Sequence, residues 1–218
     1  MNRLVRALLE KDTLPLFTIE DIIQAVDGSD NARYGLVKRA MAKGDLVRIK
    51  RGLYVLNPRY QKKRVSVFTV SHMIVGQSYI SLESALSLHG LIPEGVRTIT
   101  AVTSKNPQEY HTPMGHLSYE RVPQQRLFAG VRRIVGDYGN VWYLATPLKA
   151  LADYIYTHHG LQWDSMDPLI HSLRIEESDL REITEKDFDE LEGNYRNSRV
   201  IRFLFGLRDE ICDARSHL

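Results

Sequence analysis

The chain has a single cysteine, Cys212, and no long run of apolar residues. One thiol cannot form an intrachain disulfide, so a reducing cytoplasm is the expected compartment. The longest unbroken apolar run is Val141–Ala145, five residues, whereas a membrane-spanning helix needs about twenty. Near the start, Arg6 and Glu10 interrupt any apolar region that a signal peptide would require. The sequence therefore predicts a cytoplasmic protein without a membrane span.

Charge is plentiful, but its two signs are unevenly divided. The 218 residues are 43% hydrophobic and 26% charged, which is the balance of a folded chain rather than a disordered one. Residues 1–64 carry fourteen Lys and Arg against seven Asp and Glu, a net charge of +7, whereas residues 65–218 carry a net charge of −5. We infer a basic module for a polyanion, joined to a body with a different task. The alternative is that the charges are simply scattered.

The first 56 residues follow the element order of a winged helix-turn-helix. Three helices are predicted and then two strands, over Arg3–Lys11, Ile19–Val26, Asn31–Lys43, Leu46–Lys50 and Leu53–Leu56. Thr18 precedes the second helix as an N-cap, Gly44 stops the third, and Arg51-Gly52 joins the strands in a hairpin. The polar, basic stretch Asn57–Arg64 then marks a boundary. The predicted domains are a winged helix-turn-helix over residues 1–60 and a second domain over residues 65–218.

The third helix has the two faces that a DNA recognition helix needs. Val37, Ala40 and Met41 form an apolar stripe that can pack on the preceding helix, and small or basic residues face the other way. Arginine and asparagine can form paired hydrogen bonds with guanine and adenine, while lysine can contact phosphate or guanine. In a regular strand, Arg48 and Lys50 would share one face and lie along phosphates. The predicted DNA-binding residues are Thr18, Asn31, Arg33, Tyr34, Lys38, Arg39, Arg48, Lys50 and Arg51.

Simpler interpretations of the same residues stay open. A basic helix face can be solvated surface and nothing more. Thr18 can act as a plain N-cap, instead of opening a helix whose backbone N–H groups bind a phosphate.

The second region alternates helix and strand signals. Helices are predicted over Val65–Val75, Ser81–His89, Pro147–Tyr156 and Ser198–Asp213, and strands over Val96–Thr103, His116–Val122, Val131–Val135 and Val141–Leu144. A capping box is predicted at Thr184–Asp187. The expected fold class is α+β, with an N-terminal winged helix-turn-helix domain followed by a mixed α/β domain that has a small sheet and surrounding helices.

No pattern in the sequence predicts catalysis. Neither the adjacent pair His158-His159 nor the pair His111 and His116 has the ligand set of a metal site. Nucleotidyl transfer would need a Gly-Ser turn close to paired aspartates that hold magnesium, but Gly28-Ser29 is far from Asp187-Phe188-Asp189. We therefore predict that the chain is not an enzyme, holds no metal and needs no cofactor.

Three segments, taken in order, resemble the AbiEi antitoxin family. They are Leu36–Tyr54, which begins Leu-Val-Lys-Arg-Ala-Met-Ala-Lys-Gly-Asp-Leu, then Ser78–Leu91, and finally Ala145–Asp153. The last is similar to the family's Thr-Pro-x-(Lys/Arg)-Ala-Leu-x-Asp helix. The resemblance covers about residues 15–160, and residues 161–218 carry no match. The first motif is common among winged helices, so specificity comes from the order of all three.

The resemblance implies a transcriptional repressor of its own operon that is also the antitoxin of a type IV toxin–antitoxin system. Its functional partner would be a nucleotidyltransferase-like toxin, neutralised with help from the second domain and without a stable complex. At the matched position Asp153, we expect capping, packing or a salt bridge rather than catalysis. One winged helix reads only a few base pairs, so we expect a monomer that pairs cooperatively on an inverted repeat in operator DNA.

Two other functions fit the same sequence. One is a winged-helix regulator whose second domain senses a small ligand, with no toxin involved. The other is an enzyme of nucleic-acid metabolism that uses the basic module only to dock. A pocket with convergent polar groups would favour the first, and metal-dependent turnover would be needed for the second.

Two segments near the C-terminal end also have more than one interpretation. The acidic stretch Glu176–Glu192 can be a solvated face or can mimic nucleic acid against a basic toxin surface. The apolar stripe Val200–Leu207 is expected to be core first and a dimer contact second.

Overall fold

The computed structural model describes residues 2–11, 13–160 and 166–216, and the chain divides into two units. The first unit comprises Met1–Ile74, His111–Gly115 and Val135–Val141. The second comprises Val75–Tyr110, His116–Ile134 and Trp142–Leu218. The domain boundary that the sequence suggested, at residues 57–64, lies inside the first unit.

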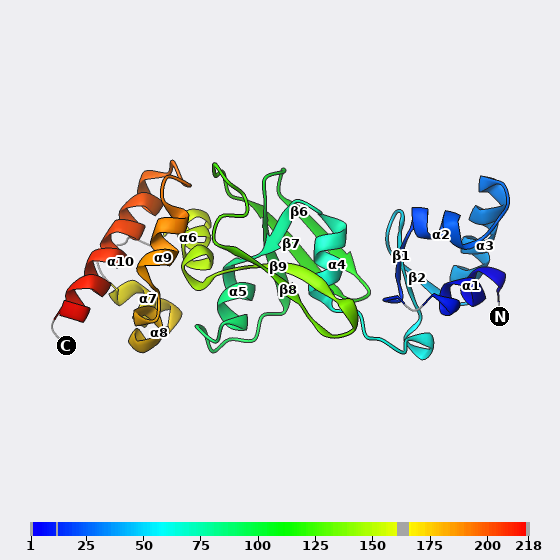
Figure 1. Cartoon of the computed structure of the whole chain (residues 1–218), viewed down its shortest axis with the longest axis horizontal. Coiled ribbons are helices and arrows are strands. Elements are labelled where there is room, and N and C mark those ends of the chain that lie inside the picture. Colours follow the sequence, from blue (N-terminus) through cyan, green and yellow to red (C-terminus); the bar gives the residue numbers. More distant parts are fainter. Residues whose placement is uncertain (1, 12, 161–165, 217–218) are drawn as a thin grey trace. The chain divides into compact units, whose positions relative to one another are not determined.

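Three helices and a three-stranded sheet make up the N-terminal part of the first unit (Figure 1). In chain order they are α1 (Arg3–Glu10), β1 (Leu16–Thr18), α2 (Ile19–Ala25), α3 (Asp30–Ala42), β2 (Leu46–Lys50) and β3 (Leu53–Leu56). The strand order is β1-β3-β2, and both pairings are antiparallel. The strand β1 was not predicted, because three residues that pair with a strand far along the chain leave no local signal.

Short polar side chains begin the helices of this part. Thr18 and Asp21 form a capping box at α2: the Thr18 backbone N–H donates to Asp21 Oδ2 over 2.7 Å, and the Asp21 N–H donates to Thr18 Oγ1 over 3.3 Å. Ser29 accepts from the backbone of Ala32 at the start of α3. At the other end of α3, Gly44 takes a φ of +67°, a conformation that glycine adopts without steric cost.

The N-terminal part has a hydrophobic core of its own. Its buried side chains come from α1, β1, α2, α3, β2 and β3, and include Leu4, Leu8, Phe17, Ile22, Val37, Ala40, Leu46 and Leu56. All of this core lies between residues 4 and 60, counting the half-buried Tyr60 that packs against it.

The rest of the first unit consists of short elements. They are η1 (Pro58–Tyr60), α4 (Val67–Ile74) and η2 (Asp137–Gly139). Asn140 is buried and joins two of these segments: its Nδ2 donates to the carbonyls of Arg64 and Asp137, and its Oδ1 accepts from the Ser66 N–H over 2.7 Å. These bonds account for the grouping of residues 135–141 with the N-terminal segment.

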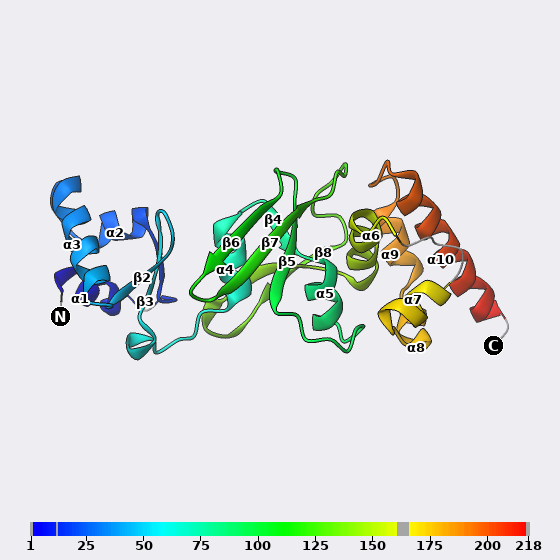
Figure 2. The same ribbon diagram turned by 180° about the vertical axis from the view of Figure 1, so that it is seen from behind.

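A six-stranded sheet has most of its residues in the second unit, with strand order β6-β7-β5-β4-β9-β8. The strands are β4 (Ser78–Ile80), β5 (Thr98–Thr103), β6 (Gln108–Thr112), β7 (Gly115–Arg121), β8 (Val131–Val135) and β9 (Val141–Ala145). Figure 2 shows β5, β6 and β7 side by side. Pairing is antiparallel between β4 and β5 and parallel between β4 and β9 and between β5 and β7, so the sheet is mixed.

Within the described residues, six helices belong to the second unit. They are α5 (Leu82–Leu88), α6 (Pro147–Thr157), α7 (Asp167–Leu173), α8 (Glu177–Arg181), α9 (Glu185–Leu191) and α10 (Ser198–Ser216). The helix α6 packs against α5, α9 and α10, and seven of its eleven residues are buried. Its Thr146 N-cap and its Pro147 at the first position match the sequence signal.

The expected mixture of α and β structure is confirmed, with more strands than the sequence indicated. Four strands were predicted for the second region, and the sheet has six. The two that were missed are β4, which has three residues, and β6, which alternates half-buried and exposed side chains. Among the described residues, no helix combines the length and apolar character that a membrane span requires.

Candidate nucleic-acid interface

Helix α3 buries one face and exposes the other. Val37 and Ala40 are completely or almost completely buried, in the core of the N-terminal part. Four of the predicted DNA contacts are exposed along the same helix: Asn31, Tyr34, Lys38 and Arg39. Tyr34 is 68% exposed. The exposed face therefore offers one amide, one phenol and two cations.

Gly35 leaves room for the side chain of Arg39. A Cβ placed on Gly35 would lie 3.3 Å from the nearer terminal nitrogen of Arg39, so the guanidinium lies against the helix surface one turn back. The guanidinium can swing away from this resting position because it is the end of a flexible side chain. Gly35 thus supplies space for the Arg39 side chain.

Arg33 is bound within the protein and is only 22% exposed. Its Nε donates to the Val26 carbonyl over 3.0 Å, and its Nη1 lies 3.2 Å from Asp30 Oδ1. These contacts join the end of α2 to the start of α3 and fix the turn between them. A base contact by Arg33 would require these bonds to break, so its present contacts are those of a positioning residue.

The three cations of the predicted wing do not lie on one exposed face. Arg48 and Arg51 are exposed, but Lys50 is half-buried and its Nζ donates to the Ile74 carbonyl over 2.6 Å. The pairing of β2 with β3 also shifts register between Arg48 and Lys50, so the strand is not regular there. Gly52 takes a φ of +82° at the turn. Two freely exposed arginines, rather than three aligned cations, stand on this hairpin.

Thr18 acts as the N-cap of α2. Its hydroxyl is shared between Asp21 Oδ2, at 2.9 Å, and the Asp21 backbone N–H. Glu20 and Asp21 in the first turn would repel a phosphate at this helix start. The observed geometry is that of the plain cap.

Sequence reasoning missed residues that hold this part together. Asn2 caps α1 and its Nδ2 donates to the Leu36 carbonyl over 2.8 Å, which joins α1 to α3. Asp45 is buried and binds both Arg59 and the Tyr60 hydroxyl. An asparagine directly before a helix was a local signal for the first. The second could not be foreseen, because residues 57–64 have the composition of a linker.

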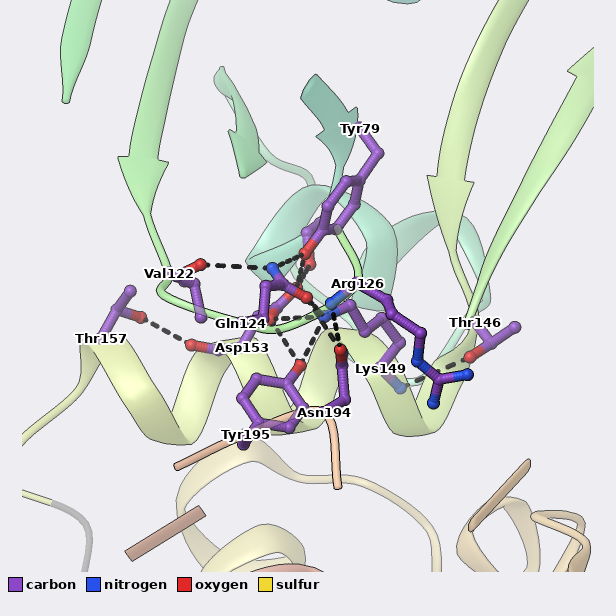
Figure 3. A network of polar contacts seen from close by, with 11 residues as sticks. Tyr79, Val122, Gln124, Arg126, Thr146, Lys149, Asp153, Thr157, Asn194 and Tyr195 are labelled. Carbon is purple, nitrogen blue, oxygen red and sulfur yellow. Dashed lines mark hydrogen bonds and ion pairs between the residues drawn. The ribbon is translucent and has the colours of Figure 1, made fainter. Parts of the chain in front are cut away.

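The second unit holds a buried polar network around Lys149 and Asp153 of α6 (Figure 3). Both side chains have no exposed surface, and Lys149 Nζ lies 3.2 Å from Asp153 Oδ1. The carboxylate also accepts from the hydroxyls of Tyr79, Ser81 and Tyr195 over 2.7–2.8 Å. Asp153 therefore makes the buried salt bridge that was expected at this position, together with three further bonds.

Lys149 uses all three of its N–H donors inside the protein. Besides Asp153, they are directed at Gln124 Oε1 and at the Tyr195 hydroxyl, 2.6 Å away. Burial lowers the pKa of Lys149, and burial raises the pKa values of Tyr79 and Tyr195 well above their usual range. With its donors used and its surface covered, this network joins β4, α6 and the segments around residues 124 and 195, and presents no reactive group.

A glycine completes the packing beside this network. Gly130 takes a φ of +69°, and a Cβ there would come within 2.8 Å of Leu191 and 3.1 Å of Lys149 Cβ. Its carbonyl accepts from the Thr146 N–H over 2.8 Å at the start of α6. Any side chain at this position would displace the Leu191 methyl group and crowd Lys149 Cβ.

The histidines lie in separate surroundings. His158 follows α6 and stacks on Tyr154 with ring centroids 3.7 Å apart, while His159 Nδ1 lies 2.8 Å from Arg199 Nη2. Within the described part of the chain, no three His, Cys, Asp or Glu side chains are grouped so that they could hold a metal ion.

Comparison with known proteins gives the fold and nothing finer. No family model matches the chain, and no curated protein does. A solved structure, that of the RV2827C protein from Mycobacterium tuberculosis, is similar with a TM-score of 0.60 at 16% sequence identity. The match covers 96% of this chain and 76% of the other. The chain therefore shares its overall fold with the mycobacterial RV2827C protein.

Proposed function

We propose that residues 1–60 form a winged helix-turn-helix that binds double-stranded DNA, with α3 as recognition helix and the β2–β3 hairpin as wing. The observation that carries the proposal is the exposed face of α3, where Lys38 and Arg39 lie opposite the buried Val37 and Ala40, with the exposed Tyr34 at its border. A recognition helix needs one face for the core and one for base edges.

In this proposal the wing adds positively charged side chains that contact DNA phosphates. Arg48 and Arg51 are exposed on the hairpin, and cations placed there neutralise phosphates and release counterions. Arg33 and Thr18 serve this interface indirectly, since they fix the α2–α3 turn and the start of α2. The proposed direct contacts are therefore Asn31, Tyr34, Lys38, Arg39, Arg48 and Arg51.

The chain as a whole is proposed to repress its own operon and to act as the antitoxin to a nucleotidyltransferase-like toxin. The support is the order of three sequence segments that resemble the AbiEi family, one of which supplies Lys149 and Asp153. In this proposal the second unit contributes to neutralisation as a rigid body, since Lys149 and Asp153 are buried and fully bonded.

DNA binding is tested with the purified chain and the DNA upstream of its own gene, by fluorescence anisotropy and footprinting. Arg39→Ala should cost about 1–3 kcal/mol in specific binding, and Lys38→Ala should weaken binding to all sequences. Arg133→Ala, an exposed arginine of β8, is the control and should bind as the wild type does. Wild-type affinity in a folded Lys38→Ala/Arg39→Ala variant would show that α3 does not read DNA.

The antitoxin role is tested separately, by co-expression with a nucleotidyltransferase-like toxin encoded beside the gene. The Lys38→Ala/Arg39→Ala variant should lose repression and still protect growth. Failure of the wild-type chain to protect growth would remove the antitoxin role and leave DNA binding intact.

A small-ligand sensor receives less support from the cavity beside α9 and α10. The cavity measures about 340 Å³, enough for a small ligand. Its lining is mostly apolar, and the Arg208 guanidinium at its edge is already bound by Glu185 and Asp189. The Tyr195 hydroxyl points away, to Asp153 and Lys149. Polar groups that could orient a ligand do not converge there.

A further inference from the structure

Helix α10 has a core face and an opposite, exposed face. Val200, Phe203, Leu207 and Ile211 recur at helical spacing and are all buried. Arg202, Phe205 and Asp209 lie on the other side and are exposed, and Phe205 is 64% exposed. The predicted core role of the stripe Val200–Leu207 therefore holds for Val200, Phe203 and Leu207 but not for Phe205.

The two charges on this face have no ion-pair partner among the described residues. Arg202 and Asp209 are seven positions apart, which on a helix is about two turns and about 10.5 Å. They face the same direction but are too far apart to pair with each other. The exposed face thus carries a cation at one end, an anion at the other and an aromatic ring between them.

The apolar surface extends sideways from Phe205. The cavity of about 340 Å³ is lined by Phe188 and Leu191 of α9 and by Ile201, Leu204 and Phe205 of α10. Next to Phe205, the half-buried Gly206 has no side chain and permits another helix to approach closely.

We propose that this face of α10 binds the same face of a second copy of the chain, with the two helices antiparallel about a two-fold axis between Phe205 and Gly206. Positions 202 and 209 lie at equal distances from that midpoint, about one turn on each side. Arg202 of each copy then faces Asp209 of the other, and each Phe205 packs beside the other copy's Gly206. Two salt bridges flank a central pair of rings.

Self-complementarity is the reason for choosing a second copy as the occupant. A two-fold interface uses one patch twice, so a cation on one side of the axis must be matched by an anion on the other. The α10 face meets this condition within its own sequence. The patch is a single helix face, so the interface is small and the association weak, with a midpoint of about 10 μM to 1 mM.

The first test is sedimentation equilibrium of the full chain from about 5 μM to 1 mM, without DNA. The weight-average mass should rise from monomer toward dimer across this range. Phe205→Asp should hold the chain at the monomer mass with unchanged circular dichroism, because this ring is largely exposed. Val135→Asp, which alters an equally exposed side chain of β8, should dimerise as the wild type does.

The decisive test is charge exchange. Arg202→Glu and Asp209→Arg should each weaken dimerisation about tenfold, because each change places like charges opposite each other twice in the symmetric pair. A mixture of these two variants should associate again, since both facing pairs are then opposite in charge. The double variant Arg202→Glu/Asp209→Arg should also recover.

Three outcomes would overturn the pairing. They are a monomer mass at every concentration, an undiminished dimer in Phe205→Asp, and no recovery in the mixture of single variants. A different protein or an apolar ligand as the true occupant would produce the first of these. The pairing rests on no DNA contact, so its failure is distinguishable from failure of the proposed function.

Pairing through α10 would give the proposed repressor a source of cooperativity. Two copies on neighbouring half-sites are held at a high effective concentration, where even a weak contact becomes populated. On operator DNA, Phe205→Asp should abolish the cooperative second step and leave the affinity of the first step unchanged. This arm alone depends on the proposed function.

Discussion

Asp45 is a carboxylate buried inside the most basic part of the chain. Its side chain is 5% exposed and binds Arg59 and the Tyr60 hydroxyl, the latter over 2.9 Å. The Tyr60 hydrogen bond, and then the bond and charge of Arg59, hold the pKa of Asp45 below its usual value of 3.8. Its ionised form is therefore favoured in the folded state over the unfolded state.

This carboxylate should contribute to acid sensitivity. Because the folded pKa is lowered, the stabilisation is present above the unfolded value and is lost as pH falls through the folded one. Asp45→Asn should therefore have a lower Tm than the wild type at pH 7, and the difference should shrink below about pH 4. Thermal unfolding at pH 7, 5 and 3 measures it, with the exposed Asp27→Asn as control. A constant difference across this range would contradict the linkage.

The Lys149–Asp153 pair makes a prediction about stability. Lys149→Met leaves a buried carboxylate without its cation and should cost about 3–5 kcal/mol in urea unfolding. The double variant Lys149→Met/Asp153→Leu should cost clearly less than the sum of the two single changes, because no unpaired charge remains. Lys105→Met, at an exposed lysine, is the control. Additive single and double effects would argue that the two side chains are not coupled.

At the scale of elements, the sequence predicted those strands and helix caps that interactions between neighbouring residues determine. The strands Leu46–Lys50 and Leu53–Leu56 and the cap at Thr146 lie where the sequence placed them. Elements held by distant partners were missed: β1 pairs with β3 almost forty residues later, and Ile80 of β4 pairs with Leu144 of β9. A three-residue strand with no turn signal of its own cannot be recognised as a strand before its pairing partner is known.

The candidate interface shows the same limit. The amphipathic pattern identified α3 and its outward Lys38 and Arg39, because burial follows helical periodicity. It could not separate Arg33 and Lys50 from the exposed cations, since their acceptors, the carbonyls of Val26 and Ile74, belong to other elements. The sequence gives the number of cations, but tertiary contacts determine which of them remain available to bind a ligand.

The α2–α3 turn should depend on Arg33. Arg33→Ala removes the bond to the Val26 carbonyl and should cost about 1–3 kcal/mol in stability if that acceptor stays unsatisfied. A Tm lowered together with DNA affinity would identify a positioning role, whereas Arg39→Ala should lower affinity alone. Lost affinity at unchanged stability would instead make Arg33 a direct contact.

At the scale of the whole molecule, the opposite net charges of residues 1–64 and 65–218 predict that only the first region binds DNA. Residues 1–64 carry +7 and contain the complete core between residues 4 and 60, so this fragment should fold and retain DNA binding. Residues 65–218 carry −5 and should bind DNA weakly or not at all. Fluorescence anisotropy on both fragments measures it. Comparable affinity in the second fragment would mean that its acidic total conceals a basic surface.

The separation of the two cores along the chain also sets an order of events during synthesis. The N-terminal core needs nothing beyond Tyr60, whereas the Lys149–Asp153 network closes only when Tyr195 has been added. Roughly 135 residues separate Tyr60 from Tyr195, which at about 5–20 residues per second takes roughly 7–27 s. During that interval a nascent chain carries a finished basic module and an unfinished second unit. Under the proposed function, a ribosome stalled in this window would hold a fragment that binds DNA before the rest of its structure can fold.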